Sequence, residues 1–404
     1  MRILFISGSI GLGHATRDLA IAQAFRRLAP EAEIVWLAGE PARSAIRQAG
    51  ETLHAEADRY RSDSDVADRA STVGGLNVFR YLLGARSQWI ANAKLVANIV
   101  GGDRFDAIVG DETYELVVAI RTKAFVCAAP FVMIYDFLGL DATTNNLLER
   151  IGVQYWNYVW SRDGEAFANG RNRALFVGEP EDIPDRPMGV RLPNRRAHAL
   201  RHYRFLGYVL PFDLEEVEDR SAVRAQLGYG DAPLVVASVG GTAAGRDLLE
   251  ACAAAFPIAR DRIPNLEMAI VCGPRIAPDS IPAPSGVRVH GFVPALYRHF
   301  AACDLAIVQA GGTTTLELTA LRRPFIYVPL EGQCEQEITV AERVARHGAG
   351  LRLSRREMTA QRLAELIAEN IGKESTWPRI HGDGAAIAAR DILEAIRSSG
   401  AAAA

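Results

Sequence analysis

The chain has 404 residues, 49% of them hydrophobic, and a formal net charge of −3. This length exceeds the ~250 to 300 residues at which a single hydrophobic core stops growing, so two globular domains are predicted. A charge so close to neutral excludes a general attraction to nucleic acid, and no nucleic-acid partner is expected.

The cysteines and the N-terminus indicate a cellular compartment. None of the five cysteines forms a CxxC pair or a zinc-ligand spacing, which is typical of reduced thiols in a cytoplasm, and no bound metal is expected. The chain begins with strand-like residues instead of a signal peptide, and no apolar run reaches the ~18 residues of a membrane span. We therefore predict a cytoplasmic protein.

The first half alternates apolar runs with helical patterns. Strands are expected at 2–7, 33–38, 107–110, 131–135, 174–177 and 203–207. Helices are expected at 14–28, 41–49, 76–100, 115–123 and 143–160. Continuous Val, Ile and Leu runs between helices indicate a parallel sheet covered on both faces, so residues 1–211 are interpreted as one Rossmann-like domain.

The second half repeats this pattern after an acidic, polar stretch at 212–232, which we interpret as a linker. Strands are expected at 234–238, 267–272, 287–290, 305–308 and 325–328. Residues 233–396 are thus interpreted as a second Rossmann-like domain, whose last helix can pack back on the first. The predicted fold class is α/β, with two doubly wound parallel-sheet domains facing across a cleft that receives ligands at the carboxyl ends of the strands.

The first glycine turn follows the first strand and reads Ser7-Gly8-Ser9-Ile10-Gly11-Leu12-Gly13-His14. Thr16 stands where the third glycine of a dinucleotide-binding fingerprint belongs, so a dinucleotide is not indicated. Gly11 and Gly13 allow close backbone approach to a ligand. The helix N-terminus is expected to hold the pKa of His14 down, which favours a general base at neutral pH; a helix cap without chemistry is the alternative.

Two further glycine turns end strands of the second half, at Gly241-Thr242 and at Gln309-Ala310-Gly311-Gly312. Thr313 then opens a helix, whose unpaired N–H groups and positive dipole end suit a diphosphate. Glu317 lies one turn further on the same helix face, where a carboxylate can accept the two hydroxyls of a ribose. A nucleotide is the predicted ligand, although parallel α/β units in general turn on glycine.

Together these motifs resemble a family of enzymes. GLGH at 11–14, SVGGT at 238–242, GFV at 291–293, AGGTTTLEL at 310–318 and CEQE at 334–337 are similar to the inverting nucleotide-sugar glycosyltransferases of the GT-B fold. The nearest pattern is that of the family 28 and family 1 group, with the peptidoglycan-precursor N-acetylglucosaminyltransferase, the diacylglycerol galactosyltransferases and the UDP-glucuronosyltransferase-like proteins. The resemblance extends over both halves and is specific only from about 292 to 336.

The resemblance implies a donor site for a nucleoside-diphosphate sugar, with a UDP-sugar expected. It assigns the nucleobase to Phe292 and Val293 and the ribose to Glu317. It assigns the sugar hydroxyls to Gln336, with Glu335 or Glu337 beside it. It assigns the diphosphate to Gly311, Gly312, Thr313 and Thr314, with Gly241 and Thr242 closing over it. Cys334 and Glu335 stand where relatives place an Asp, so the sugar is left undetermined.

The resemblance also implies inversion at the anomeric carbon, with His14 taking the acceptor proton. No metal is required, because helix N-termini and backbone donors can stabilise the leaving diphosphate. Asp111 and Glu112 follow the strand at 107–110, where some relatives keep an acid that orients the histidine; a structural N-cap is the alternative. Asp136 is a second candidate for orienting the acceptor or the base.

The acceptor is a hydroxyl that the sequence does not identify, with a lipid and a secondary metabolite both compatible. The helix at 143–160 carries Tyr155, Trp156, Tyr158 and Trp160, which suit such an acceptor or a bilayer surface, but its helical spacing is more typical of a buried face. The Arg-rich stretch 186–204 suits a phosphorylated acceptor or an anionic lipid, and equally a solvated connection. Peripheral attachment to the inner face of the membrane is therefore an alternative to a purely cytoplasmic location.

Two other functions fit the same sequence. The UDP-N-acetylglucosamine 2-epimerases share this architecture, and an isomerase of that kind would use the same nucleotide-binding half without an acceptor. A glycosyltransferase-like protein can also be a non-catalytic, nucleotide-binding partner of another enzyme. An inert His14 beside an intact donor site would indicate that case.

Overall fold

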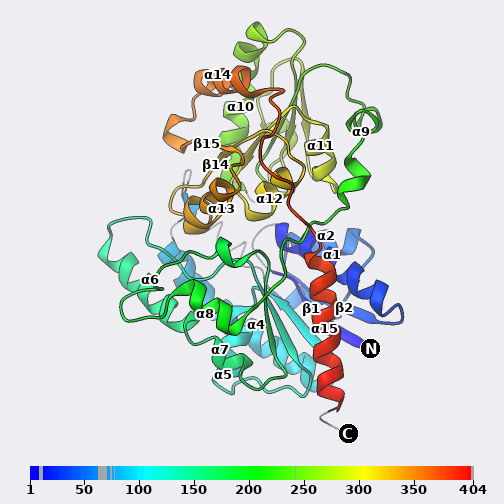
Figure 1. Cartoon of the computed structure of the whole chain (residues 1–404), viewed down its shortest axis with the longest axis vertical. Helices are drawn as coiled ribbons and strands as arrows, with labels where there is room; N and C mark the ends of the chain where they lie inside the picture. The colour runs from blue at the N-terminus through cyan, green and yellow to red at the C-terminus, as the bar shows by residue number, and fades with distance from the viewer. Residues whose placement is uncertain (9–11, 62–70, 73–74, 77, 242, 402–404) are drawn as a thin grey trace. The chain divides into compact units, whose positions relative to one another are not determined.

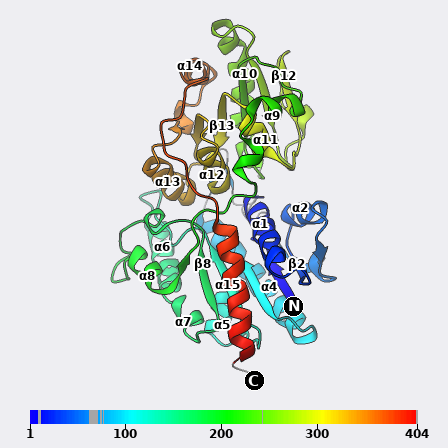
Figure 2. The ribbon, with the colours of Figure 1, turned by 45° about the vertical axis from the view of Figure 1, so that its right-hand side comes forward.

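The computed structural model describes residues 1–8, 12–61, 71–72, 75–76, 78–241 and 243–401. The chain divides into two compact units. Met1–Ala70, Val78–Pro211 and Gly382–Ala404 form the first unit, and Phe212–His381 with Ser71–Asn77 form the second. Figures 1 and 2 show that each unit is a sheet covered by helices.

The first unit is built on a seven-stranded parallel sheet of order β3-β2-β1-β6-β7-β8-β9. Two of its inner strands, β6 and β7, consist entirely of buried residues, as expected for apolar runs covered on both faces. The strands are β1 (Arg2–Ile6), β2 (Glu33–Leu37), β3 (Thr52–Leu53), β6 (Ala107–Asp111), β7 (Phe131–Tyr135), β8 (Arg173–Phe176) and β9 (Arg204–Phe205).

Helices cover both faces of this sheet, and successive side chains of β1 pack alternately on the two faces. Ile3 and Phe5 belong to one buried cluster, whereas Leu4 and Ile6 belong to the other, as the two-residue period of a strand requires. The helices are α1 (Gly13–Leu28), α2 (Ala42–Gln48), α4 (Val78–Gly102), α5 (Tyr114–Arg121), α6 (Leu147–Trp160), α7 (Gly164–Phe167), α8 (Arg195–His202) and α15 (Gly384–Ala401).

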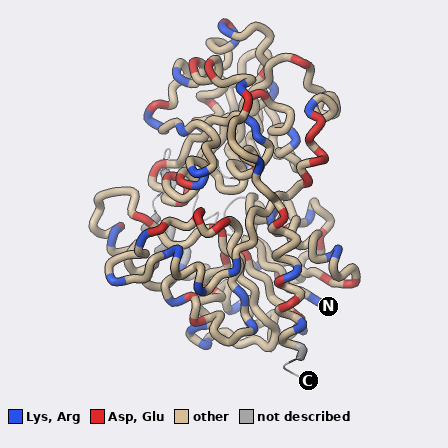
Figure 3. Tube along the Cα trace, in the orientation of Figure 1, with Lys and Arg blue, Asp and Glu red and all other residues tan. Residues whose placement is uncertain are grey.

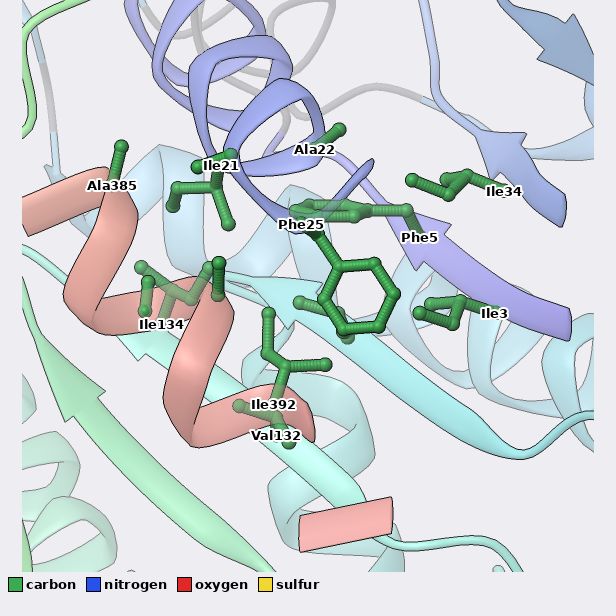
Figure 4. Close-up of a cluster of buried hydrophobic side chains, with 14 of the residues drawn as sticks. Ile3, Phe5, Ile21, Ala22, Phe25, Ile34, Val132, Ile134, Ala385 and Ile392 are labelled. Atoms are coloured by element: carbon green, nitrogen blue, oxygen red, sulfur yellow. The ribbon is translucent and has the colours of Figure 1, made fainter. Parts of the chain in front are cut away.

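The last helix, α15, packs against α1 in the first unit. Figure 4 shows Ile392 of α15 and Phe25 of α1 over the same face of the sheet, near Ile134. Ala388 and Ala389 of α15 are fully buried and allow the two helices to approach closely. We expected 233–396 to form the second domain, with its last helix able to pack back; in the structure 382–404 are part of the first unit.

The second unit has a six-stranded parallel sheet of order β12-β11-β10-β13-β14-β15. Its strands are β10 (Leu234–Ser238), β11 (Glu267–Val271), β12 (Val287–His290), β13 (Leu305–Gln309), β14 (Phe325–Val328) and β15 (Leu351–Arg352). Its helices are α9 (Arg220–Leu227), α10 (Arg246–Arg262), α11 (Leu296–Ala302), α12 (Gly312–Ala320), α13 (Ala341–Arg346) and α14 (Ala360–Asn370). A two-stranded antiparallel pair, β4 (Ser71–Thr72) and β5 (Gly75–Leu76), is grouped with this unit by its contacts.

Residues 212–232, which we expected to be a linker, are part of the core of the second unit. A short helix, Leu214–Val217, and α9 lie in this stretch. Val217, Val223 and Tyr229 are buried in the cluster that covers one face of the sheet. The acidic residues that suggested a linker occupy only the outer side of these helical turns.

Each sheet has one point at which the strand order reverses. In the first unit the reversal lies between β1 and β6, and in the second between β10 and β13. Ligands of open α/β sheets bind outside the carboxyl ends of the strands at such a point. The turns after β1 and β13, and Asp111 at the end of β6, therefore occupy the expected ligand-binding positions.

The aromatic face of α6 is exposed, contrary to the buried face that its spacing favoured. The helix begins at Leu147 because Asn146 caps it, with Asn146 Oδ1 accepting from the N–H of Leu148 at 2.9 Å. Side chains with exposed fractions of 47 to 68% follow its outer face: Leu147, Ile151, Tyr155 and Tyr158. The buried side of the helix carries Asn157 and Trp160 instead.

Part of the Arg-rich stretch 186–204 is structural. Arg195 is almost completely buried and forms two 2.8 Å hydrogen bonds with the carboxylate of Asp141. Elsewhere Lys and Arg alternate with Asp and Glu over both units (Figure 3). Within the part of the chain that the structure describes, no helix is both long and apolar enough to cross a membrane.

Candidate active site

The turn after β1 brings the histidine predicted to be the base against the sheet edge. His14 is the second residue of α1, and its side chain is 13% exposed. Its ring packs over Gly8, where a Cβ would come within 2.7 Å of His14 Cγ. Glycine is therefore required at position 8. Gly13 begins α1, while Gly11 lies outside the described residues.

Asp111 holds the histidine from the end of the neighbouring strand. His14 Nδ1 lies 3.0 Å from Asp111 Oδ2, and Asp111 is fully buried. Arg17 also approaches His14 Nδ1 at 2.8 Å, but the same guanidinium nitrogen already donates to both Asp111 oxygens, at 2.6 and 2.7 Å. We therefore assign Nδ1 as the N–H that donates to Asp111, which leaves Nε2 to accept a proton.

Arg17, one turn after His14, joins the two predicted acids. Its other terminal nitrogen donates to Asp136 Oδ2 at 2.7 Å. Asp111 ends β6, and Asp136 follows β7, so one buried guanidinium spans the ends of adjacent strands. The structure thus brings together His14, Asp111 and Asp136, with Arg17 between the two carboxylates.

Glu112 completes this group from the other side of the ring. Its Oε2 lies 3.5 Å from His14 Nε2, and Tyr114 donates to its Oε1 at 3.1 Å. The backbone of Glu112 has φ 51°, in the left-handed region that side chains other than glycine rarely adopt. This strained backbone directs the residue after β6 toward the histidine.

The pKa of His14 is raised, contrary to the lowering expected from the helix N-terminus. Burial lowers the pKa of the imidazole, but the charge of Asp111 and its hydrogen bond outweigh burial. Arg17 opposes Asp111 only in part. Burial is the largest single effect on the pKa of His14, and the net rise comes from Asp111 with a smaller contribution from Asp136.

The four carboxyl groups around Arg17 divide into two pairs. Burial raises the pKa values of Asp111 and Asp136, but the charges of Arg17 and His14 together outweigh burial, and both pKa values fall below their ordinary range. Burial, followed by a neighbouring carboxylate, raises the pKa values of Glu112 and Asp18 well above theirs. The group therefore favours ionised carboxylates at Asp111 and Asp136, beside Arg17 and His14. It favours protonated carboxyl groups at Glu112 and Asp18.

The junction of β13 and α12 in the second unit has the geometry of an anion site. Gly311 precedes the helix without a side-chain cap, and the N–H of Thr315 is the first to find a backbone acceptor, at Gly311 O. Among the described residues, no backbone carbonyl accepts from the N–H groups of Gly312, Thr313 or Thr314. These donors and the helix dipole favour a phosphate oxygen.

Glu317 lies in the next turn of α12 and is only 7% exposed. Burial raises the pKa of its carboxyl to about 8. Within the described parts of the chain no hydrogen bond to its side chain is found. A buried carboxyl without a partner is costly, and a ligand that offers hydroxyl groups would supply the missing hydrogen bonds.

A π-helical segment after β14, Glu335–Val340, begins with Glu335 and Gln336, whose side chains have different surroundings. The Glu335 carboxylate lies beside the turn, since a Cβ on Gly312 would be 3.3 Å from Glu335 Oε1. Gln336 is 5% exposed, and its Oε1 accepts from the N–H of Leu330 at 3.0 Å. The amide oxygen of Gln336 therefore fixes the loop, which leaves its NH₂ group for a ligand.

The remaining predicted donor residues also follow strand ends. Gly241 is buried after β10, and Thr242 lies outside the described residues. Phe292, after β12, is 36% exposed, and Val293 is half-buried. All four strands concerned, β10, β12, β13 and β14, are parallel, so these residues share one edge of the sheet.

The sequence did not identify Arg17 and gave Glu112 only as a neighbour of Asp111. The i, i+3 spacing of His14 and Arg17 places both on one face of α1, which was a usable signal. The partners of Arg17 are 94 and 119 residues away, and the sequence alone does not show that pairing.

Comparison with known proteins adds a family. Residues 235–383 match the glycosyltransferase family 28 C-terminal domain. This match contains the α12 junction, Glu317 and the segment with Glu335 and Gln336. It ends at the point where the chain returns to the first unit.

Most of the related proteins match this chain over only part of its length. An uncharacterized glycosyltransferase of Methanopyrus kandleri is 30% identical over 191 residues, which are 46% of this chain and 53% of that protein. The UDP-N-acetylglucosamine–N-acetylmuramyl-(pentapeptide) pyrophosphoryl-undecaprenol N-acetylglucosamine transferase of Mycolicibacterium vanbaalenii is 32% identical over 160 residues, 38% of this chain and 39% of that enzyme. The chain thus spans about half or less of these two relatives. The same-named enzyme of Pelobacter propionicus is 23% identical over 390 residues, 92% of this chain and 91% of that enzyme.

Solved structures are similar over the whole chain. The calicheamicin glycosyltransferase has a TM-score of 0.57 at 16% identity and covers 99% of this chain and 95% of its own. The spinosyn rhamnosyltransferase with spinosyn aglycone has a TM-score of 0.54 at 16% identity, with 99% and 97% covered. At this identity the likeness shows the fold, which is GT-B. The chain thus has the GT-B fold, and its second unit is similar in sequence to the family 28 glycosyltransferases.

Proposed function

We propose that the protein transfers a sugar from a nucleoside-diphosphate sugar, with UDP as the expected nucleotide, to an acceptor hydroxyl with inversion. The observation that carries the proposal is the α12 junction, where N–H groups and a buried carboxyl have no hydrogen-bond partner among the described residues. The diphosphate would bind Gly311 to Thr314, and the ribose hydroxyls would bind Glu317. The family of residues 235–383 supports a sugar nucleotide over other nucleotides.

In the proposed reaction His14 Nε2 takes the proton of the acceptor hydroxyl. The acceptor oxygen then forms a bond to the anomeric carbon while the bond from that carbon to the diphosphate oxygen breaks. The electron pair of the broken bond goes to the nucleoside diphosphate, whose charge the N-terminus of α12 stabilises. Asp111, ionised and bonded to Nδ1, stabilises the imidazolium that forms.

The proposal requires no metal, because backbone donors and the helix dipole hold the diphosphate. Activity should therefore persist in excess EDTA. The acceptor is a hydroxyl compound of unassigned class. The exposed face of α6 is compatible with a lipid or an apolar secondary metabolite, and also with attachment of the protein to a membrane surface.

A nucleotide screen followed by turnover tests the proposal. A nucleoside diphosphate at ~100 times its dissociation constant should stabilise the protein by about 2.7 kcal/mol, which thermal unfolding detects. Transfer is then followed as release of the nucleoside diphosphate from a sugar nucleotide in the presence of candidate acceptors. Conversion to a different sugar nucleotide without acceptor would instead support an isomerase, and binding without turnover a nucleotide-binding partner. No stabilisation by any nucleotide at millimolar concentration would reject the donor site.

A further inference from the structure

The second unit has a cavity at the sheet edge opposite to the proposed donor site. Its volume is about 590 Å³, and it lies where β13 and β14 begin, lined by Asp304, Arg323 and Pro324. The donor residues follow the carboxyl ends of these same parallel strands. Strands of four or five residues at ~3.3 Å each separate the two edges, so the cavity is not part of the donor site.

Two guanidinium groups, Arg220 and Arg323, and one carboxylate, Asp304, line the inner wall of this cavity. Asp304 accepts hydrogen bonds from both Arg220 and Arg224, so two guanidinium groups share one carboxylate. Both arginines also donate to the carbonyl of Ala302. These contacts give Arg220 and Arg224 clear structural roles at the start of β13.

Arg323 is the second guanidinium of this wall, and it is partly buried. Its Nε is buried without a hydrogen bond, and in the described parts of the chain no ion pair or hydrogen bond of its side chain is found. Burial, followed by the charge of Arg220, lowers the pKa of Arg323. A partly buried cation close to other cations is stabilised when an anion neutralises it.

The outer rim adds donors around Arg323. Lys373 and Ser375 line the cavity from the segment after α14, and Arg322 donates to the carbonyl of Ser375. The ammonium of Lys373 donates to an amide oxygen, Asn370 Oδ1, and no described carboxylate forms an ion pair with it. Exposed carboxylates at Glu215 and Glu374 lie on the same rim, which favours a compact anion seated deep in the cavity over a large polyanion.

We propose that this cavity binds a phosphate group, free or on a small metabolite, with Arg323 as its principal donor. A planar guanidinium presents two parallel N–H groups to two phosphate oxygens, and the cavity is large enough for a phosphate with a small substituent. The anion would neutralise the charge that Asp304 leaves in excess. This site does not rest on the proposed glycosyl transfer, since no donor residue takes part in it.

Inorganic phosphate is the probe, titrated at constant ionic strength against the full chain and followed by hydrogen exchange. In the wild-type protein phosphate should slow exchange in 320–324 and 372–376. Protection confined to 311–315 would place phosphate at the donor turn and overturn the proposal. No protection at tens of millimolar phosphate would also overturn it.

Variants then test whether Arg323 binds the phosphate. Arg323→Ala should weaken phosphate protection of 372–376 at least tenfold, and Arg323→Lys should weaken it less, because one charge remains. Arg362→Ala is the matched control, since Arg362 is an exposed arginine of α14 that pairs with Glu365 away from the cavity. Equal phosphate affinity in Arg323→Ala and Arg362→Ala would overturn the assignment. Repeating the hydrogen-exchange titration with glucose 6-phosphate distinguishes the two possible ligands. Tighter binding than that of inorganic phosphate indicates a phosphorylated metabolite, and weaker binding indicates free phosphate.

Discussion

His14 is the residue on which the proposed proton transfer depends. Replacing it with Ala should lower kcat by ~10² to 10⁴ and leave nucleotide affinity nearly unchanged, because proton removal matters only in the transition state. The measurement combines turnover with a direct titration of UDP. A variant with near-normal kcat would reduce His14 to a structural residue, and a parallel loss of UDP affinity would make it a phosphate ligand.

The carboxylate of Asp111 should set the pH at which His14 becomes a base. Since Asp111 raises the pKa of His14 above its ordinary 6.5, kcat/KM of the wild-type enzyme should rise with pH through an ionisation above that value. Asp111→Asn removes the charge, so the rising limb should move to lower pH while the plateau falls. The pH profiles of the two proteins check this, with donor affinity as the control for folding. An unmoved limb would mean that another group controls the rate.

Glu317 should make the stability of the protein depend on pH. Its pKa is raised from 4.5 unfolded to about 8 folded, so its stabilising, protonated form is fully present below pH 4.5 and is lost as pH rises to 8. Each unit of that interval corresponds to about 1.4 kcal/mol. Glu317→Gln should therefore gain stability relative to wild type between pH 5 and pH 8.5, measured by denaturant unfolding.

The same substitution should weaken UDP binding by about 1 to 3 kcal/mol, because the ribose hydroxyls lose a carboxylate acceptor. A 2′-deoxy analogue should be less affected. Glu357→Gln, on an exposed turn of the same unit, serves as the control for both measurements. If Glu317→Gln and Glu357→Gln bind UDP equally well, the ribose assignment is wrong.

At the scale of elements, the strands were predictable and the faces of some helices were not. The strands at 131–135 and 305–308 are unbroken apolar runs with few alternatives, and the structure has β7 and β13 there. For α6, the spacing of Leu147, Ile151 and Tyr155 showed that one face is apolar. Spacing does not show whether another element covers that face, and here it is exposed.

For the candidate sites, the sequence predicted residues that lie within one motif and did not predict side-chain contacts between distant segments. Gly312 and Glu317 lie within one motif, so the sequence places them relative to each other. The grouping of His14, Asp111 and Asp136 depended on the rule that parallel strands end at one edge, which brings distant residues together. Arg17 and the raised pKa of His14 depend on side-chain contacts across that edge, which neither spacing nor composition reveals.

The packing of α15 on α1 makes the last helix part of the stability of the first unit. Ile392 is 1% exposed in the cluster with Phe25, and Ile392→Ala should cost about 2 to 5 kcal/mol through lost burial and the cavity left behind. Native-state hydrogen exchange should show faster opening in α1 and β1, with β13 and α12 little changed. Ile396→Ala, at a half-buried position of the same helix, should cost less. Equal effects in both units would show that they unfold as one.

At the scale of the whole molecule, the donor and base residues belong to different units. A nucleoside diphosphate should therefore protect amides of the second unit, above all 240–245 and 311–318, more than those of the first. Hydrogen exchange with and without UDP measures this directly. Protection confined to the turn before α1 would instead indicate a cofactor site in the first unit.

The chain leaves the first unit after Pro211 and returns to it only after His381. During synthesis, every residue of 212–381 therefore leaves the ribosome before the helix that covers α1. Until then the apolar side of α1 that carries Ile21 and Phe25 has no α15 to bury it. A nascent chain stopped near residue 381 would carry a complete second unit and an unfinished first one. The order of translation thus makes the first unit, although it begins the protein, the last to acquire its native core.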